Sequence, residues 1–256
     1  MRIAIAGGTG TLGRYVVDAV RAAGHQPTVI SRSRGIDVIT RTGLDDALRD
    51  TSVVIDATNM TTVSAKKSTA FFQTATQNLL DAGQRAGVTH HLVLSIVGID
   101  RVDLGYYKGK LAQERVALAG PVPATVLRAT QFYEFAGQML TRGGPFAIVP
   151  RMTTQPIAAR EVADALVVLA LGDPVGRAPD IAGPERREMS DLVRALVHAR
   201  GERRLMVPIR LPGAVGRAMT GGGLLPTGEG PRGTQTFEEW LATDGARDAS
   251  TSTDAP

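Results

Sequence analysis

The stretch MRIAIAGGTGTLGR, residues 1–14, decides the fold that this sequence predicts. Small and β-branched apolar residues fill positions 3–6, which is typical of a buried parallel strand. The glycines Gly7, Gly10 and Gly13 follow, and the dense apolar positions between residues 15 and 20 favour a helix that packs on a sheet. The stretch therefore predicts a strand, a tight turn and a helix.

Each glycine of this turn has its own expected task. Gly7 would permit the sharp turn, Gly10 would let a phosphate approach the backbone, and Gly13 would let the helix lie close to the strand. The free N–H groups of the helix start and the helix dipole suit an anion such as a pyrophosphate. Because 29 of the 256 residues are glycine, the triplet gains its weight from its place between a strand and a helix. The predicted dinucleotide-binding residues here are Gly7, Thr9, Gly10, Thr11, Leu12 and Gly13.

Composition limits the remaining possibilities. An apolar content of 43% over 256 residues suits one large α/β fold with a sizeable core. The chain has no cysteine, and none of its four histidines pair at the spacing of a helical metal site, so we predict no metal centre. A net charge of +4 with scattered basic residues argues against nucleic-acid binding. The chain enters its first strand at once and no apolar run approaches about 18 residues, so we expect no signal peptide, no membrane association and a cytoplasmic location.

The end of the second expected strand, residues 27–31, indicates which cofactor is bound. A fold that prefers NAD usually places a carboxylate there to bind the adenosine ribose. This sequence instead has Ser31 and Arg32, and a guanidinium can pair with a 2′-phosphate. We therefore predict NADP(H) in preference to NAD(H). The alternative is an exposed loop with solvated arginines.

Two further segments are expected beside the cofactor. Asp37 and Val38 end a short extended piece that would lie near the adenine. The third expected strand covers residues 52–57, and ligands of open α/β sheets bind at the carboxyl ends of the strands. We therefore expect Ala57, Thr58 and Asn59 to face the cofactor.

A second group of residues suggests chemistry. Ser95 ends the fourth expected strand, residues 90–95, and Tyr106 and Lys110 follow at i and i+4, on one face of an expected helix. A neighbouring ammonium should lower the pKa of the Tyr106 phenol, which suits a general acid near pH 7. A Tyr and a Lys on an exposed helix face are common, so the order of Ser95, Tyr106 and Lys110 after the glycine turn is the stronger signal.

At this point the sequence resembles the short-chain dehydrogenase/reductase superfamily, and within it the atypical, NmrA-like NAD(P)-binding branch. The resemblance covers roughly residues 1–171 and rests on GGTGTLG, Arg32, LVLSIVG, YYKGKLAQE and TVLRATQFYEF. It implies that Tyr106 donates a proton, that Lys110 binds the nicotinamide ribose and lowers the pKa of Tyr106, and that Ser95 orients a substrate carbonyl. Two features make catalysis a weaker expectation than cofactor binding. The gap from Ser95 to Tyr106 is slightly shorter than in the common single-domain pattern of the superfamily, and the branch includes redox sensors that bind cofactor without turnover.

The rest of the chain is expected to form a substrate side. We predict a Rossmann-type, doubly wound, mostly parallel core over residues 1–145, a small C-terminal substrate-side lobe interleaved with it over residues 146–243, and a disordered tail over residues 244–256. Phe132 and Tyr133 would wall an apolar substrate, although aromatic residues at the start of a helix are equally often core.

Local patterns predict further elements. Apolar spacing predicts helices over residues 65–86 and 159–171, and short strands are expected at 146–150, 155–158 and 179–182, with a loop at 151–154. Ser190 is expected to cap the helix that follows it, and Thr236 with Glu239 is expected to form a capping box.

These observations favour an NADP(H)-dependent oxidoreductase that transfers a hydride to a small-molecule carbonyl or quinone. The alternative is a non-catalytic NADP(H) sensor that acts through a protein partner. An NAD-dependent nucleotide-sugar epimerase is a weaker third hypothesis, disfavoured by Arg32 and by the small lobe. A monomer or a homodimer is expected.

Overall fold

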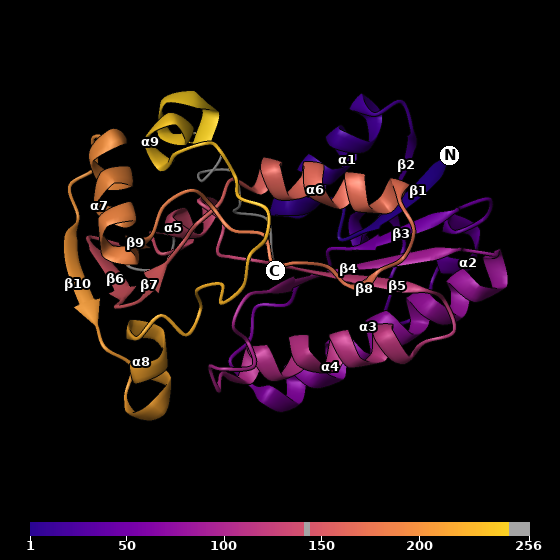
Figure 1. The fold of residues 1–256 in the computed structure, drawn as a ribbon, viewed down its shortest axis with the longest axis horizontal. Helices are drawn as coiled ribbons and strands as arrows, with labels where there is room; N and C mark the ends of the chain where they lie inside the picture. Colours follow the sequence, from indigo (N-terminus) through magenta and orange to yellow (C-terminus); the bar gives the residue numbers. More distant parts are fainter. Residues whose placement is uncertain (141–143, 246–256) are drawn as a thin grey trace.

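The computed structural model describes residues 1–140 and 144–245, and its centre is a parallel sheet of six strands (Figure 1). All neighbouring strands of this sheet run parallel, in the order β2-β1-β3-β4-β5-β8. The strands are β1 (Arg2–Ala6), β2 (Gln26–Ile30), β3 (Val53–Asp56), β4 (His90–Ile96), β5 (Ala124–Ala129) and β8 (Gly176–Arg177). The predicted α/β fold of the Rossmann type is confirmed.

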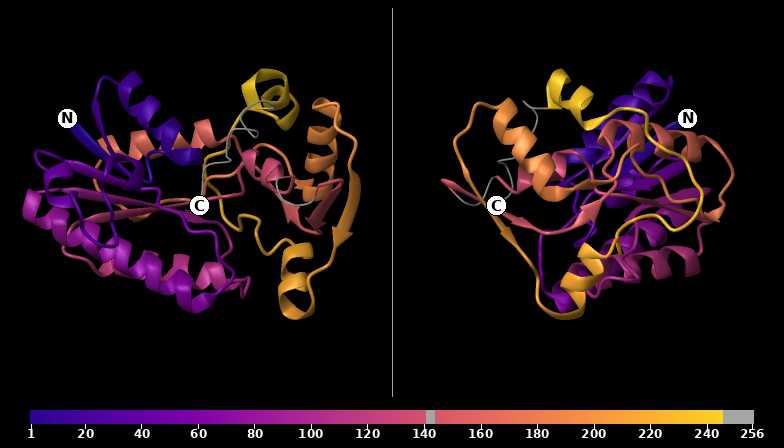
Figure 2. Two further views of the ribbon diagram at one scale, coloured as in Figure 1. Left: turned by 180° about the vertical axis from the view of Figure 1, so that it is seen from behind. Right: turned by 60° about the vertical axis from the view of Figure 1, so that its left-hand side comes forward.

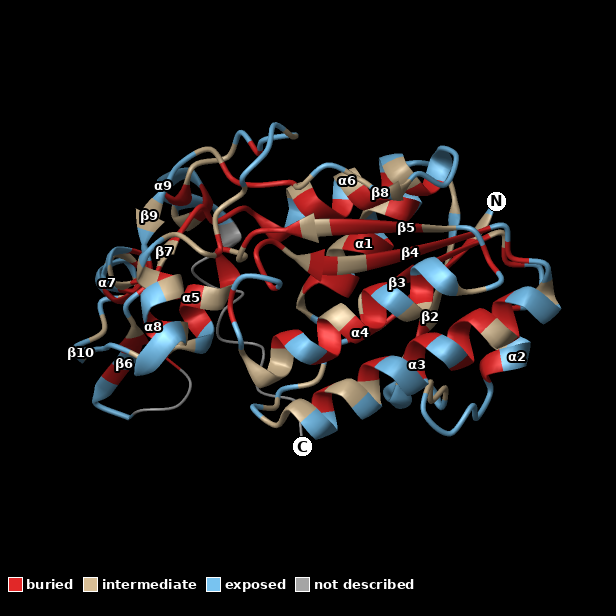
Figure 3. Ribbon diagram, turned by 60° about the horizontal axis from the view of Figure 1, so that its bottom comes forward, coloured by how far each residue is buried: buried red, intermediate tan, exposed pale blue. Residues whose placement is uncertain are grey.

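Helices cover both faces of the sheet. On one face α1 (Thr11–Ala22) packs beside α6 (Ala159–Leu171), and on the other α3 (Ala65–Ala86) packs beside α4 (Gly105–Ala119) (Figure 1). The short α2 (Leu44–Ala47) contacts α3. Strands β4 and β5 are buried along most of their length between these layers (Figure 3).

The alternation along β1 explains the two layers. Ile3 and Ile5 belong to the apolar cluster that includes α1 and α6, whereas Ala4 and Ala6 belong to the cluster that includes α3. Successive side chains of a strand point to opposite faces. A strand that is buried on both faces needs an apolar residue at every position, which is what RIAIA supplies from its second residue onward.

A lobe lies beyond the carboxyl ends of the strands, at the left of Figure 1 and the right of the first view in Figure 2. It has two small sheets, in which β10 pairs parallel with β6 and β7 pairs antiparallel with β9. Between its parts the chain returns to the main sheet as α6 and β8. The lobe elements are α5 (Glu134–Gln138), β6 (Phe146–Pro150), β7 (Thr153–Thr154), β9 (Arg187–Glu188), α7 (Met189–Ala199), β10 (Leu205–Ile209), α8 (Gly213–Thr220) and α9 (Phe237–Trp240).

Local expectations in the lobe were met in part. The predicted capping box is confirmed, because the Thr236 side chain accepts from the Glu239 backbone N–H while the Glu239 carboxylate accepts from the Thr236 N–H. Ser190 was wrongly predicted as a helix cap, since α7 already begins at Met189 after its N-cap Glu188.

Three short segments also differ from expectation. The predicted loop at 151–154 contains strand β7, which pairs with β9. The predicted strands at 155–158 and 179–182 form only isolated bridges, through Ile157, Ile181 and Ala182. These pieces are held by long-range partners, which local sequence does not reveal.

Residues 241–245 form a short π-helical turn, η2 (Leu241–Gly245), and the remainder of the expected tail, 246–256, lies outside the described residues. Among residues 1–140 and 144–245, every helix is too short or too polar to cross a bilayer. The same residues contain no group of three or more acidic, His or Cys side chains arranged to hold a metal ion.

Candidate functional site

The glycine turn lies where the winding of the sheet reverses. Strand β1 is flanked by β2 on one side and by β3 on the other, and open α/β sheets bind ligands at such a switch point. Gly7 adopts a φ of +76°, and its N–H donates to the Ile30 carbonyl at 3.0 Å. A Cβ at Gly7 would lie 2.7 Å from the carbonyl oxygen of Ala57. Glycine is therefore required at this position by both backbone angle and space.

Gly13 brings the helix against the turn. A Cβ at this residue would lie 2.1 Å from the Gly7 carbonyl oxygen, so no larger residue fits without moving the helix. Gly10 is the N-cap of α1, and no side chain caps the helix there. Thr9 and Gly10 are exposed, whereas the Leu12 side chain is buried in the core. The expected structural tasks of Gly7 and Gly13 agree with this geometry, and the phosphate contact at Gly10 stays a prediction.

Two cations follow β2 directly. The 3-10 turn η1 (Arg32–Arg34) begins after Ser31, whose Oγ lies 3.0 Å from the Ser33 Oγ. Arg32 and Arg34 are both exposed, and neither forms an ion pair with any residue that the structure describes. Both guanidinium groups are therefore available to an anionic ligand.

Asp37 and Val38 do not form the extended piece that was predicted. They lie in a turn between η1 and α2, because the Asp37 Oδ1 accepts from the Ile39 N–H at 2.7 Å and from the Thr40 N–H at 3.3 Å. The Val38 carbonyl accepts from the Asn78 Nδ2 at 2.7 Å. The turn is thus fastened to α3, and its contact with an adenine stays a prediction.

A buried carboxylate lies below the expected cofactor edge. Asp56, the last residue of β3, is fully buried. Its Oδ1 accepts from the Thr58 N–H at 3.0 Å and from the Thr58 hydroxyl at 2.6 Å, and its Oδ2 accepts from Thr76 at 3.1 Å and from Gln113 Nε2 at 2.9 Å. The side chain of Thr58, predicted to face the cofactor, is therefore turned toward Asp56.

Lys110 belongs to the same buried network. Its ammonium donates to the Leu94 carbonyl at 2.7 Å and to the Gln113 side-chain oxygen, and it lies 4.7 Å from the centre of the Phe72 ring. Burial lowers the pKa of Lys110 to about 8, although the carboxylates of Asp56 and Glu114 oppose that shift. The ammonium is committed to interior partners, so its contact with a nicotinamide ribose stays a prediction.

The expected effect of Lys110 on Tyr106 was wrong. Burial, followed by the neighbouring Tyr107, raises the pKa of Tyr106 well above its ordinary value instead of lowering it. The physical reason is direction, since the i and i+4 residues lie on adjacent parts of the helix but Lys110 points to Leu94 and Gln113. The Tyr106 hydroxyl instead donates to the Asn59 Oδ1 at 2.8 Å. Tyr106 and Asn59 are therefore brought together by the structure.

Ser95 is buried in a different polar cluster. Its hydroxyl donates at 2.5 Å to the Oε1 of Glu114, which is fully buried. Arg128 binds both oxygens of that carboxylate at 2.8 Å, and Arg177 binds one of them at 2.7 Å. Burial acts to raise the pKa of Glu114, but the hydrogen bonds from Arg128, Ser95 and Arg177 outweigh it and lower the pKa. The structure thus gives Ser95 a partner other than Tyr106, and its contact with a substrate stays a prediction.

The two aromatic residues after β5 have different surroundings. Tyr133 is 2% exposed, its hydroxyl donates to the Gln235 carbonyl at 2.7 Å, and its ring packs against Phe237 and Trp240. The core interpretation therefore applies to Tyr133. Phe132 is half-buried against the main apolar cluster and remains a candidate for a substrate wall.

Sequence reasoning missed the acidic residues that orient these groups. Glu114 lies four residues after Lys110, on the buried side of α4, and Asp56 ends a strand whose other residues are apolar. A carboxylate inside a buried apolar strand needs partners. A carboxylate at the end of an apolar strand was therefore the signal that could have identified Asp56. No pattern near Gln113 in the sequence indicated that its side chain would bridge Asp56 and Lys110.

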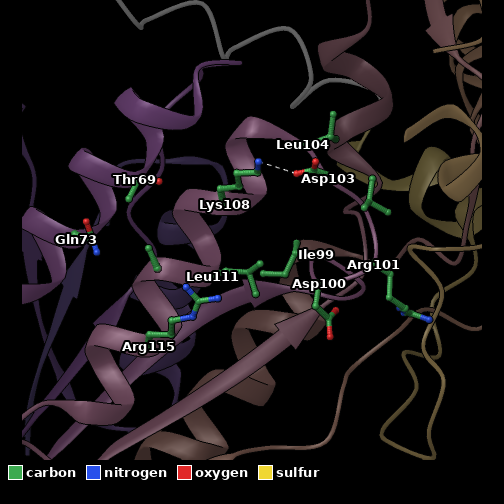
Figure 4. A pocket seen from close by; sticks show the side chains of 12 residues that line it. Thr69, Gln73, Ile99, Asp100, Arg101, Asp103, Leu104, Lys108, Leu111 and Arg115 are labelled. Carbon is green, nitrogen blue, oxygen red and sulfur yellow. Dashed lines mark ion pairs between the residues drawn. The ribbon is translucent and has the colours of Figure 1, made fainter. Parts of the chain in front are cut away.

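A cavity of about 540 Å³ lies between α3, α4 and the segment that follows β4 (Figure 4). Thr69 and Gln73 of α3 and Lys108 and Arg115 of α4 line it, together with the segment that follows β4. Lys108 forms an ion pair with Asp103 at 3.0 Å. The predicted site residues are absent from its lining, although Leu104 and Lys108 of the lining lie two residues on either side of Tyr106.

Comparisons with known proteins give the fold. Neither a protein-family model nor a curated protein matches the sequence. Among solved structures, UDP-N-acetylglucosamine 4-epimerase from Bacillus cereus is similar with a TM-score of 0.71 and 18% identity, over 100% of this chain and 99% of that one. MoeE5 in complex with UDP-glucose and NAD gives a TM-score of 0.75 and 19% identity, over 98% of this chain and 100% of that one.

A third similar structure is RMD from Pseudomonas aeruginosa complexed with NADPH, with a TM-score of 0.68 and 15% identity over 97% of this chain and 99% of that one. At these identities the likeness shows a shared fold. It extends over the lobe as well as over the parallel sheet.

Proposed function

We propose that this protein is an NADP(H)-dependent oxidoreductase of the short-chain dehydrogenase/reductase type that reduces a small carbonyl or quinone. One juxtaposition carries the proposal. The space at Gly7 is closed by the carbonyl of Ala57, and two residues further on Asn59 accepts the hydroxyl proton of Tyr106. A phosphate-binding turn and a proton donor thus meet at one edge of the sheet.

The residues at this edge fit the cofactor. The turn from Gly7 to Gly13 leaves the start of α1 without a side-chain cap, and an uncapped helix start suits a pyrophosphate. The exposed Arg32 would bind the 2′-phosphate. When bound, the nicotinamide supplies the hydride. Of the similar structures, MoeE5 is a complex with NAD and RMD is a complex with NADPH, which supports a nicotinamide cofactor in this fold.

Tyr106 would then protonate the oxygen of the reduced carbonyl. Its raised pKa keeps the phenol protonated at neutral pH. That proton is donated to Asn59 in this structure, and it would pass to the substrate oxygen once the hydroxyl turns toward it. Asn59 holds that hydroxyl in place. In this proposal Lys110 acts on Tyr106 only indirectly, by fixing α4 to β4 through the Leu94 carbonyl.

The position of Lys110 favours a second candidate, a sensor that binds NADP(H) without turnover. A buried Lys110 does not stabilise the Tyr106 phenolate, so proton transfer from Tyr106 is costly. A third candidate is an epimerase that acts on nucleotide sugars, because two similar structures are UDP-sugar 4-epimerases. The size of the lobe does not count against it, because the chain spans 99% of the Bacillus cereus epimerase. The lack of a carboxylate beside Arg32 still counts against the epimerase, because an NAD-dependent fold usually has one there.

The test is Tyr106→Phe, with oxidation of NADPH followed over a panel of quinones, aldehydes and ketones. We expect turnover to fall by at least about 100-fold, since general acid catalysis contributes that much, while NADPH affinity changes less than about twofold. Tyr107→Phe is the matched control, because Tyr107 is also a buried phenol on α4 but has no described bond to Asn59.

Other outcomes distinguish the candidates. Unchanged turnover in Tyr106→Phe removes Tyr106 from the mechanism. Tight NADPH binding by the wild type with no turnover over the whole panel supports the sensor. Interconversion of UDP-sugars without net cofactor oxidation supports the epimerase.

A further inference from the structure

The two parallel strands of the lobe present an apolar outer face. In their register Phe146 lies opposite Leu205, and Ile148 lies opposite Val207. Opposite residues of a strand pair point to the same side, and alternate residues share a side. The β6–β10 face is therefore formed by Phe146, Ile148, Pro150, Leu205, Val207 and Ile209.

Exposure separates the two sides of β6, and less sharply those of β10, where Met206 and Val207 are both half-buried and Pro208 is exposed. Leu205 is 64% exposed, Ile148 48%, Phe146 46% and Ile209 38%, whereas Ala147 and Val149 on the other side are fully buried in the lobe core. Parallel strands are normally covered on both faces. Contiguous exposed apolar side chains mark a surface that binds something.

Basic residues stand at the ends of this face. Arg203 precedes β10, and Arg151 and Arg210 directly follow β6 and β10. All three side chains are exposed, and within residues 1–140 and 144–245 none of them forms an ion pair or a side-chain hydrogen bond. By contrast, the nearby Arg204 is occupied by Glu202 and by the Leu140 carbonyl. The face therefore has an apolar centre, and exposed arginines that have no partner among the described residues stand at the two ends of its strands.

We propose that the β6–β10 face binds another protein through a segment that is apolar along its centre and acidic at its edges. Carboxylates on that segment would pair with Arg151, Arg203 and Arg210, and complementary charges at the rim of an interface give specificity and speed association. A second copy of this chain fits less well. A two-fold contact of the face with itself would oppose arginine to arginine at the rim.

The position of the face supports a role beyond the proposed reaction. Strand β10 forms the outer edge of the lobe, on the side away from the six-stranded sheet (Figures 1 and 2). Its outer surface is therefore separate from the edge that carries Gly7 and Tyr106. Binding there leaves the cofactor edge open, so this inference does not depend on the proposed function.

The experiment selects peptides from a random 16-residue display library on the whole immobilised protein, with counter-selection on an Ile148→Ser/Leu205→Ser variant. We expect the enriched peptides to combine apolar and acidic residues. A labelled enriched peptide is then titrated by fluorescence anisotropy. Its Kd should rise at least about tenfold in Ile148→Ser/Leu205→Ser and in Arg203→Ser/Arg210→Ser, which corresponds to about 1.4 kcal/mol.

Val168→Ser is the matched control, because Val168 is 71% exposed on α6, outside the face. It should change the Kd less than about twofold, and circular dichroism should show that every variant is folded. Enrichment of basic or neutral peptides, no enrichment over the counter-selected variant, or equal binding by the variants overturns the proposal.

Two further measurements test whether a second copy of this chain or a membrane surface binds the face instead. Sedimentation velocity that shows a wild-type dimer, abolished in Ile148→Ser/Leu205→Ser, assigns the face to a second copy. Flotation with vesicles of phosphatidylserine and phosphatidylcholine, lost in the same variant, assigns it to a membrane surface. Either result contradicts the proposal of a protein partner, which predicts no dimer through this face and no flotation with vesicles.

Discussion

The glycine turn and the Tyr106–Lys110 segment of α4 were both interpreted from short motifs. The turn has the predicted geometry, whereas the side chains on α4 have other partners than predicted. At the turn, Gly7 and Gly13 are fixed by backbone geometry within a few residues of sequence. On α4, Lys110 is directed by the Leu94 carbonyl of β4. Glu114 is directed by Arg128 and Arg177, which also lie on other elements. A motif that constrains the backbone could be interpreted from sequence alone, whereas one that depends on side-chain direction could not.

Of the substitutions that test the α4 network, Lys110→Met is expected to have the largest effect on stability. Removing the ammonium leaves the Asp56 carboxylate buried without a compensating charge. Lys110 also donates to the Leu94 carbonyl and to Gln113 Oε1, and both acceptors lose their donor in this variant. A buried polar group left without its partner costs about 1–3 kcal/mol, so the two together cost about 2–6 kcal/mol. We expect the free energy of unfolding at pH 7, measured by urea denaturation, to fall by that amount.

The double variant Asp56→Asn/Lys110→Met is the control for this cause. It removes both charges, and Gln113 can turn its freed amide oxygen toward the new amide at position 56. We expect it to regain a substantial part of the loss. If the double variant is as unstable as the sum of the single variants, the charge of Lys110 does not compensate Asp56.

A smaller effect is expected from His91, which lies on β4 beside the same network. Burial lowers the pKa of His91 from 6.5 to about 4, against the attraction of Asp56. Below pH 6.5 the unfolded chain binds a proton that the native protein does not, so stability falls as the pH drops from 6.5 to 4. The loss is on the order of 3 kcal/mol at pH 4.

His91→Leu should flatten that slope. Urea denaturation at several pH values between 4 and 7 measures it, and the neighbouring His90, whose pKa is lowered chiefly by burial, keeps a weaker slope of the same sign. An unchanged slope in His91→Leu would mean that other groups cause the acid sensitivity.

The glycine side of the comparison is tested by Gly13→Ala. The added Cβ would lie 2.1 Å from the Gly7 carbonyl oxygen, which forces α1 away from β1. Overpacking of this kind costs about 1–3 kcal/mol, and NADPH affinity should fall with it. Gly228→Ala is the control, because no atom lies within 4 Å of its added Cβ. Equal stability of the two variants would contradict the close contact.

The extent of successful prediction follows the same division. The parallel sheet, the bounds of α3 at 65–86 and of α6 at 159–171, and the capping box at Thr236 came from periodicity and end signals that lie within each element. The Asp56 and Glu114 clusters, strand β7 and the raised pKa of Tyr106 did not, because each depends on groups distant in sequence. The order of Ser95, Tyr106 and Lys110 along the chain could suggest a site, but it could not show which of the three side chains contact one another.

The smallest and most direct test concerns the exposed Arg32. Our central claim is that the edge beside the glycine turn holds NADP(H), with Arg32 on the 2′-phosphate. A charge-assisted hydrogen bond of this kind is worth about 1.5–3 kcal/mol. Fluorescence titration should therefore show that the wild type binds NADPH more tightly than NADH by about tenfold or more.

Arg32→Ala decides the claim when it is titrated in parallel with Arg115→Ala, a control that removes an exposed cation from the outer side of α4. We expect Arg32→Ala to raise the Kd of NADPH at least about tenfold and that of NADH less than about twofold. Arg115→Ala should change neither Kd. Equal losses for both cofactors in Arg32→Ala, or a wild type without preference for NADPH, would contradict it.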